Sequence, residues 1–144
     1  MASSTDDRIG ILQDISKSWL ALVKVIRPMT DEQMMIPDQV DDWSIKDIMA
    51  HIAFWEGRVI HNIGLLERGE TPPETGDFEP INQQEATRSR SASLDDVKAQ
   101  FDGTHVQLME LLEVTPHLSR ELVAGNTYEH YDEHLEDINK SLRK

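Results

Sequence analysis

Histidines are the side chains of this sequence whose spacing most clearly suggests chemistry. His130 and His134 form an H-x-x-x-H pair, and residues four apart on a helix project side by side. That spacing lets two imidazoles bind one metal ion, as in helical zinc sites. The alternative is that both are solvated histidines at the edge of a core, because such a pair also occurs on helices that bind nothing.

His51 is a third histidine at the edge of an apolar helix face. On a helical wheel it lies on a polar seam beside Asp47 and Arg58, with Trp55 close to the same seam. Two helices that each present histidine beside a core stripe favour a shared metal site over incidental histidines. Three further histidines show no such pattern and are not assigned to a site: His61, His105 and His117.

Glu56 interrupts the apolar stripe of the helix that carries His51. A buried carboxylate must be ion-paired, protonated or hydrogen-bonded to backbone donors. A hydrogen bond that anchors the core is the favoured interpretation of Glu56. A catalytic role is the alternative.

Composition limits the classes of function. The chain has 144 residues, no cysteine, and 14 basic against 27 acidic residues, for a net charge of −13. This length predicts one domain, residues 1–144. The negative charge opposes binding to nucleic acid or to an anionic membrane, and the lack of cysteine excludes a thiol nucleophile within the chain. Neither a spanning apolar run nor a signal peptide is recognisable, so a cytoplasmic location is expected.

Four segments with a helical period must position these side chains. They cover about 6–26, 44–69, 94–114 and 127–142. Ser44 and Asp47 form a capping box at the start of the second segment. The apolar stripes predict a core that includes the following residues: Ile15, Trp19, Ile48, Ile52, Ile63, Phe101, Leu108, Leu112, Leu135 and Ile138.

The connection over residues 69–93 reads as a long loop, because it is rich in Pro, Ser, Gln and Arg. About 24 residues reach at most some 79 Å, which is ample to run back along a helix of roughly 37 Å. The second and third helices can therefore lie parallel. The sequence predicts an all-α four-helix bundle with one crossover connection.

Two segments are similar to the signature of a known superfamily. Residues 43–56 read WSIKDIMAHIAFWE, and residues 128–134 read YEHYDEH. They closely resemble the DinB/YfiT-like superfamily, nearest to the branch related to ClbS and DfsB proteins. In that superfamily a Trp-Ser pair opens the second helix, followed by His and a Trp-Glu pair, and an H-Y-x-x-H piece lies on the last helix. The order, the separation and the long middle connection agree over nearly the whole chain.

The resemblance implies an up-down-down-up bundle and a three-histidine metal site formed by His51, His130 and His134. Three histidines leave a position for water or substrate, as in catalytic sites, and imidazole suits zinc or nickel. Asp137 or Asp47 can accept the distal ring N–H of a ligand histidine, although Asp47 can instead be occupied by its cap. Because imidazole must be neutral to bind, the metal is expected to be lost near pH 6.5.

The implied activity is that of a metal-dependent enzyme. The resemblance points to a thiol-dependent transferase or a hydrolase of small electrophilic compounds, with a low-molecular-weight thiol as an external cosubstrate. Arg58 is a candidate to hold a carboxylate of the ligand, and Trp55 to contact the substrate. The alternatives are a non-catalytic metal-binding stress or self-protection protein and a plain structural bundle. By analogy, a homodimer through an exposed helix face is also expected.

Overall fold

A computed structural model describes residues 5–37, 43–73 and 79–142, and within them the chain is helical with no strand. The long helices are α1 (Thr5–Ile26), α3 (Ile45–Glu67), α5 (Leu94–Val114) and α7 (Tyr128–Leu142). The shorter elements are α2 (Asp31–Met35), α4 (Glu79–Arg90), α6 (Arg120–Val123) and the 3-10 helix η2 (Ala124–Asn126). None of these described helices combines the length and apolarity needed to cross a bilayer.

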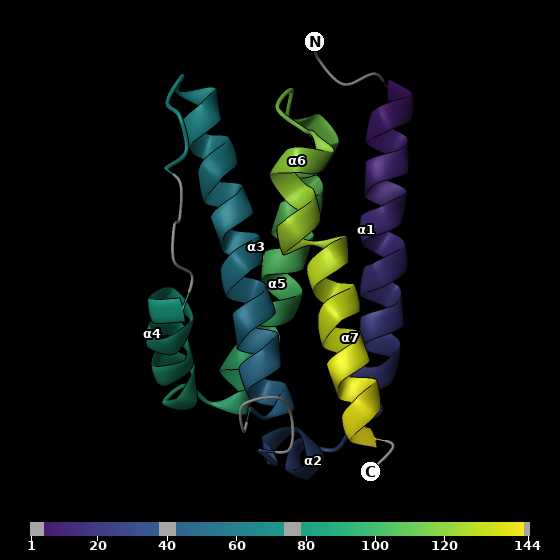
Figure 1. The fold of residues 1–144 in the computed structure, drawn as a ribbon, viewed down its shortest axis with the longest axis vertical. Coiled ribbons are helices and arrows are strands. Elements are labelled where there is room, and N and C mark those ends of the chain that lie inside the picture. The colour runs from purple at the N-terminus through teal and green to yellow at the C-terminus, as the bar shows by residue number, and fades with distance from the viewer. Residues whose placement is uncertain (1–4, 38–42, 74–78, 143–144) are drawn as a thin grey trace.

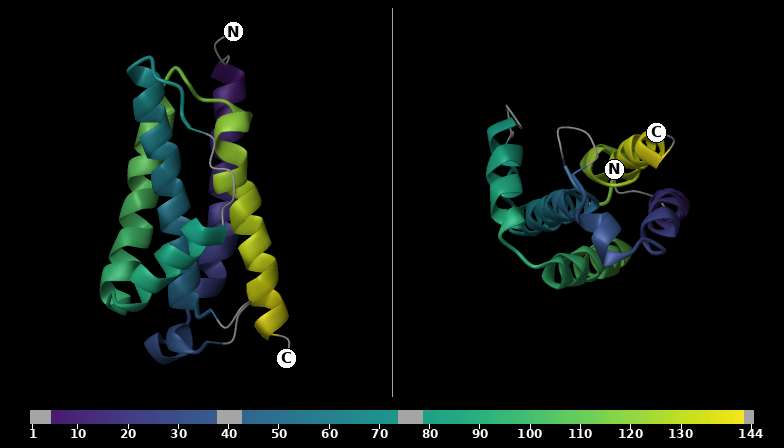
Figure 2. Two further views of the ribbon diagram at one scale, coloured as in Figure 1. Left: turned by 60° about the vertical axis from the view of Figure 1, so that its left-hand side comes forward. Right: turned by 90° about the horizontal axis from the view of Figure 1, so that it is seen from below.

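The four long helices form an up-down-down-up bundle (Figure 1). Helices α3 and α5 run in the same direction and pack closely, as do α1 and α7, which run the opposite way. The predicted bundle topology with parallel second and third helices is therefore confirmed. It places α3 beside α7 (Figure 2).

Hydrogen bonds fix both ends of α3. The Asp47 N–H donates to Ser44 Oγ at 3.1 Å, and the Ser44 N–H donates to Asp47 Oδ2 at 2.9 Å, which completes the predicted capping box. At the other end Gly69 has φ +76°, and the N–H groups of Gly69 and Glu70 donate to the carbonyls of Leu66 and Leu65. This pattern terminates a helix through a glycine in the left-handed region.

The structure corrects the prediction that residues 69–93 form a loop, because α4 occupies Glu79–Arg90. Helix α4 packs against α3 on the outside of the bundle (Figure 2). The Trp55 Nε1–H donates to Asn82 Oδ1 at 3.0 Å, and Lys46 Nζ donates to the Arg90 carbonyl at 3.3 Å. Contacts with α3 thus stabilise a helix whose own sequence is mostly polar.

The core lies between the long helices and agrees with the predicted stripes. Nine of the ten predicted core residues are buried, and the tenth, Leu135, is partly buried and packs against them. Helix α5 continues through Gly103, since a helical glycine costs only about 1 kcal/mol relative to alanine.

Leu112 provides a test of this core. Its side chain is fully buried in α5, so Leu112→Ala is expected to lower the free energy of unfolding by about 2–5 kcal/mol. Urea denaturation measures this change, with Leu20→Ala as the control because Leu20 is 63% exposed on α1. A loss below about 1 kcal/mol would show that the Leu112 side chain contributes little to core packing.

Candidate metal centre

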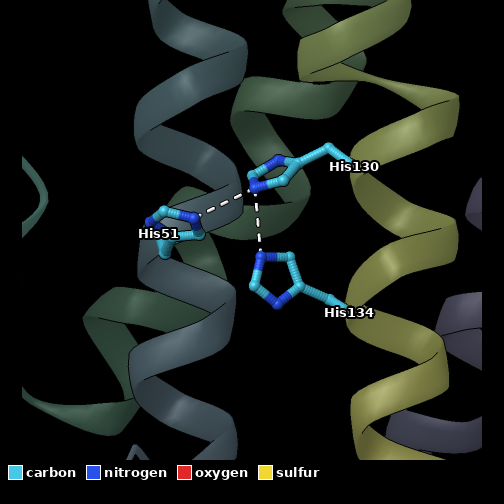
Figure 3. A group of neighbouring side chains, drawn as sticks. All are labelled: His51, His130 and His134. Carbon is cyan, nitrogen blue, oxygen red and sulfur yellow. Dashed lines mark hydrogen bonds between the residues drawn. The ribbon is translucent and has the colours of Figure 1, made fainter. Parts of the chain in front are cut away.

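Three imidazoles converge between α3 and α7 (Figure 3). His51 projects from α3, and His130 and His134 project from successive turns of α7. His130 Nε2 lies 3.0 Å from His51 Nε2 and 3.0 Å from His134 Nε2. One ring nitrogen from each histidine lies within 4.8 Å of the other two. Nitrogens that bind one tetrahedral ion at 2.0–2.1 Å lie about 3.3 Å apart, so this spacing fits a shared ion.

Ordinary hydrogen bonds do not account for both short contacts of His130 Nε2. In a neutral imidazole this nitrogen either carries a proton or presents one lone pair. A single hydrogen bond therefore explains one of the two 3.0 Å contacts but not both. A cation between the three nitrogens would satisfy all three lone pairs at once. The donor set thus fits a metal ion better than it fits a hydrogen-bonded chain.

Burial keeps all three imidazoles neutral. It is the main cause that lowers the pKa of His51 to about 3, of His130 to about 2 and of His134 to about 4. Neighbouring histidines lower the pKa of His51 and His130 further, whereas Asp137 partly opposes the shift of His134. Neutral rings offer their lone pairs to a metal without losing a proton. The expected pH of metal loss therefore moves below 6.5.

Comparison with known protein families agrees with this arrangement. A family model described as the DinB superfamily matches residues 14–137. The chain belongs to the DinB superfamily. The matched residues of this DinB-superfamily chain include the three converging histidines, His51, His130 and His134. No curated protein and no solved structure matches it.

Two aspartates were predicted to orient the ligand histidines of the DinB-superfamily site. Asp137 Oδ2 lies 4.0 Å from His134 Nδ1, which is close but longer than a hydrogen bond. Asp47 Oδ2 instead accepts the Ser44 N–H, the cap role that the sequence had left open. Among the described residues His130 Nδ1 is buried without a hydrogen-bond partner. The Trp43 and His51 rings form a T-shaped pair, with centroids 4.9 Å apart.

Trp55 and Arg58, the predicted substrate contacts, lie on other parts of α3. Trp55 is buried and donates its indole N–H to Asn82 of α4. Arg58 is half-buried and lines a depression between α3 and α5. The structure therefore gives Trp55 a role in attaching α4, and a substrate role for either residue stays a prediction.

Glu56 lies in the core of this DinB-superfamily bundle, fully buried. Its Oε2 accepts the Tyr131 hydroxyl at 2.7 Å and lies 2.7 Å from His105 Nδ1. These contacts correspond to the favoured interpretation of Glu56 as a core anchor. His105 was not assigned from the sequence, although it falls four residues after Phe101 on the apolar stripe of α5. A polar residue on such a stripe is the signal that indicated Glu56 and that also marks His105.

Proposed function

We propose that this protein is a metal-dependent enzyme in which His51, His130 and His134 bind one divalent ion, zinc or nickel. The proposal rests on the convergence of three neutral imidazoles, two buried and one partly buried, at nitrogen distances suited to one ion. Three protein ligands leave a coordination position for water or substrate, which distinguishes catalytic from structural zinc sites. Membership of the DinB superfamily, which includes metal-binding enzymes, supports the same function.

The reaction class follows from the ligand set and the composition. A bound divalent ion lowers the pKa of a coordinated thiol or water and polarises an electrophile. Because the chain has no cysteine, a thiol must arrive as a low-molecular-weight cosubstrate. We therefore infer that the reaction is one of two on small electrophilic compounds. Either an external thiol is transferred to the compound, or the compound is hydrolysed.

The chain positions the three histidines, shields two of them from water and carries a negative net charge. His51 and His130 are buried, and Trp43 covers His51 from one side. The Asp137 carboxylate near His134 Nδ1 favours the tautomer in which Nε2 keeps its lone pair. A net charge of −13 attracts divalent cations to the protein surface. The free lone pairs and the negative net charge favour capture of a cation over binding of a free anion.

Metal content and thiol binding test this function. Protein purified without a histidine tag is expected to contain about one divalent ion per chain by elemental analysis. Calorimetric titration with glutathione is expected to show binding to the metal-loaded protein and none to the chelator-treated protein. Conversion of an alkyl halide in the presence of glutathione would then establish transfer.

The other outcomes separate the alternatives. Metal and thiol binding without turnover of electrophiles or strained rings would favour the non-catalytic binding protein. Absence of any bound ion after supplying zinc and nickel in turn would leave a structural bundle and overturn the proposal.

A further inference from the structure

A second polar cluster lies in the core and connects all four long helices. Glu56 of α3 accepts the Tyr131 hydroxyl of α7 and contacts His105 of α5, each at 2.7 Å. The His105 ring stacks on Trp19 of α1, with centroids 3.6 Å apart and planes within 5°. Glu56 is the member that α5 and α7 share, and Trp19 of α1 contacts the cluster through His105 and Tyr131.

This polar cluster stabilises the core less than apolar side chains would. Within the described residues Glu56 Oε1 is buried with no hydrogen-bond partner, and an unsatisfied buried carboxylate oxygen opposes folding. Well-packed apolar side chains of similar volume often stabilise a core as well or better than buried polar groups. The value of Glu56 therefore lies in the geometry that it imposes rather than in stability.

The geometry that it imposes is the placement of α7 against α3. Tyr131 follows His130 directly in α7, and its hydroxyl bonds to the helix that carries His51. Packing between α3 and α7 is slight compared with the α3–α5 and α1–α7 pairs. The Tyr131–Glu56 bond is therefore a main direct tie between the two helices that supply the metal ligands.

We propose that Glu56 is a positioning residue for the metal centre. Held from one side by His105, its Oε2 accepts the Tyr131 hydroxyl and thereby sets how closely His130 approaches His51. This role rests on the proposed function, because it concerns the geometry of that site. It requires an acceptor oxygen at residue 56 and a donor at residue 131, and it requires no contact of either with substrate.

Metal affinity in matched variants tests this role. Tyr131→Phe removes only the hydroxyl, and it is expected to raise the metal dissociation constant by about 10–100-fold, as loss of outer hydrogen-bond partners does. Glu56→Gln keeps an oxygen that accepts from both donors, so its affinity is expected to stay at the wild-type value. Competition with a chromophoric chelator measures the constants. The visible spectrum of the cobalt-loaded protein is expected to change in Tyr131→Phe alone, since it reports ligand geometry.

Leu112→Ala is the control, because it destabilises the core about two helical turns beyond His105 on α5. It is expected to bind metal like the wild type, which separates positioning from general loss of stability. If Tyr131→Phe does not fold, the pair Glu56→Leu with Tyr131→Phe removes donor and acceptor together, and the same loss of affinity is expected. Wild-type affinity and an unchanged cobalt spectrum in the tyrosine variants would refute the inference while leaving the proposed function intact. A wild-type protein that binds no ion would refute both.

Discussion

Replacing His130 with alanine is expected to abolish stoichiometric metal binding. His130 is the central histidine of the three, since its Nε2 lies 3.0 Å from a nitrogen of each other histidine. Its removal leaves two ligands on different helices, and the affinity for zinc or nickel is expected to fall by roughly a hundred-fold or more. Elemental analysis after dialysis, together with competition by a chromophoric chelator, measures this loss.

The variant should remain folded, because the apolar residues of α7, such as Ile138, still pack into the core. Circular dichroism checks this point. His61→Ala is the matched control, since His61 lies on the same helix as His51 but is exposed. Full metal content in His130→Ala would exclude the three-histidine site.

Acid is expected to destabilise the metal-free protein steeply below pH 6.5. The folded-state pKa values of His51, His130 and His134 are lowered to about 3, 2 and 4, whereas histidine in the unfolded chain has a pKa near 6.5. As the pH falls through this window, the three histidines become protonated in the unfolded state but stay neutral in the folded state. Each such proton lowers the free energy of unfolding by about 1.4 kcal/mol per pH unit, so three histidines give a slope of up to about 4 kcal/mol per pH unit near pH 5.

Urea denaturation with chelator present, at several pH values from about 7.5 to 5, measures this slope. Carboxylates also titrate toward the lower end, so the informative quantity is the difference between wild type and His130→Ala. Removing one of three suppressed histidines is expected to reduce the slope by about a third. His61→Ala is the control, because that ring is solvent-exposed. Equal slopes in wild type and His130→Ala would show that His130 titrates normally in the folded protein.

Periodicity and caps predicted the long helices because those signals are local. The Ser44–Asp47 box and the apolar stripe of α5 lie within single helices and need no partner to be recognised. Helix α4 was missed for the opposite reason. Its residues are mostly polar, and the bonds from Trp55 and Lys46 that hold it come from α3. Tertiary contacts of that kind produce no hydrophobic periodicity in the sequence.

The same distinction explains the candidate site. The spacing of His130 and His134 indicated their pairing on one helix, but only the bundle topology brings His51 to them. Glu56 was expected to need a partner, yet a wheel drawn for one helix does not show which residue faces it from another. His105 therefore remained unassigned until the packing of α3 on α5 placed it at Glu56. The two roles open to Asp47 were likewise resolved only by the observed cap.

The placement of the ligands on α3 and α7 also affects how an ion would enter and leave. His51 and His130 are 79 positions apart in the chain, so an ion held by both closes a long loop and restricts the unfolded chain as a covalent cross-link does. Helix α7 supplies two of the three nitrogens and is the last helix of the bundle. Because α7 packs on α1 through contacts of its own, the helix is docked independently of an ion, and a bound ion would further oppose its detachment. Loss of the ion through detachment of α7 would require the α1–α7 packing to break as well.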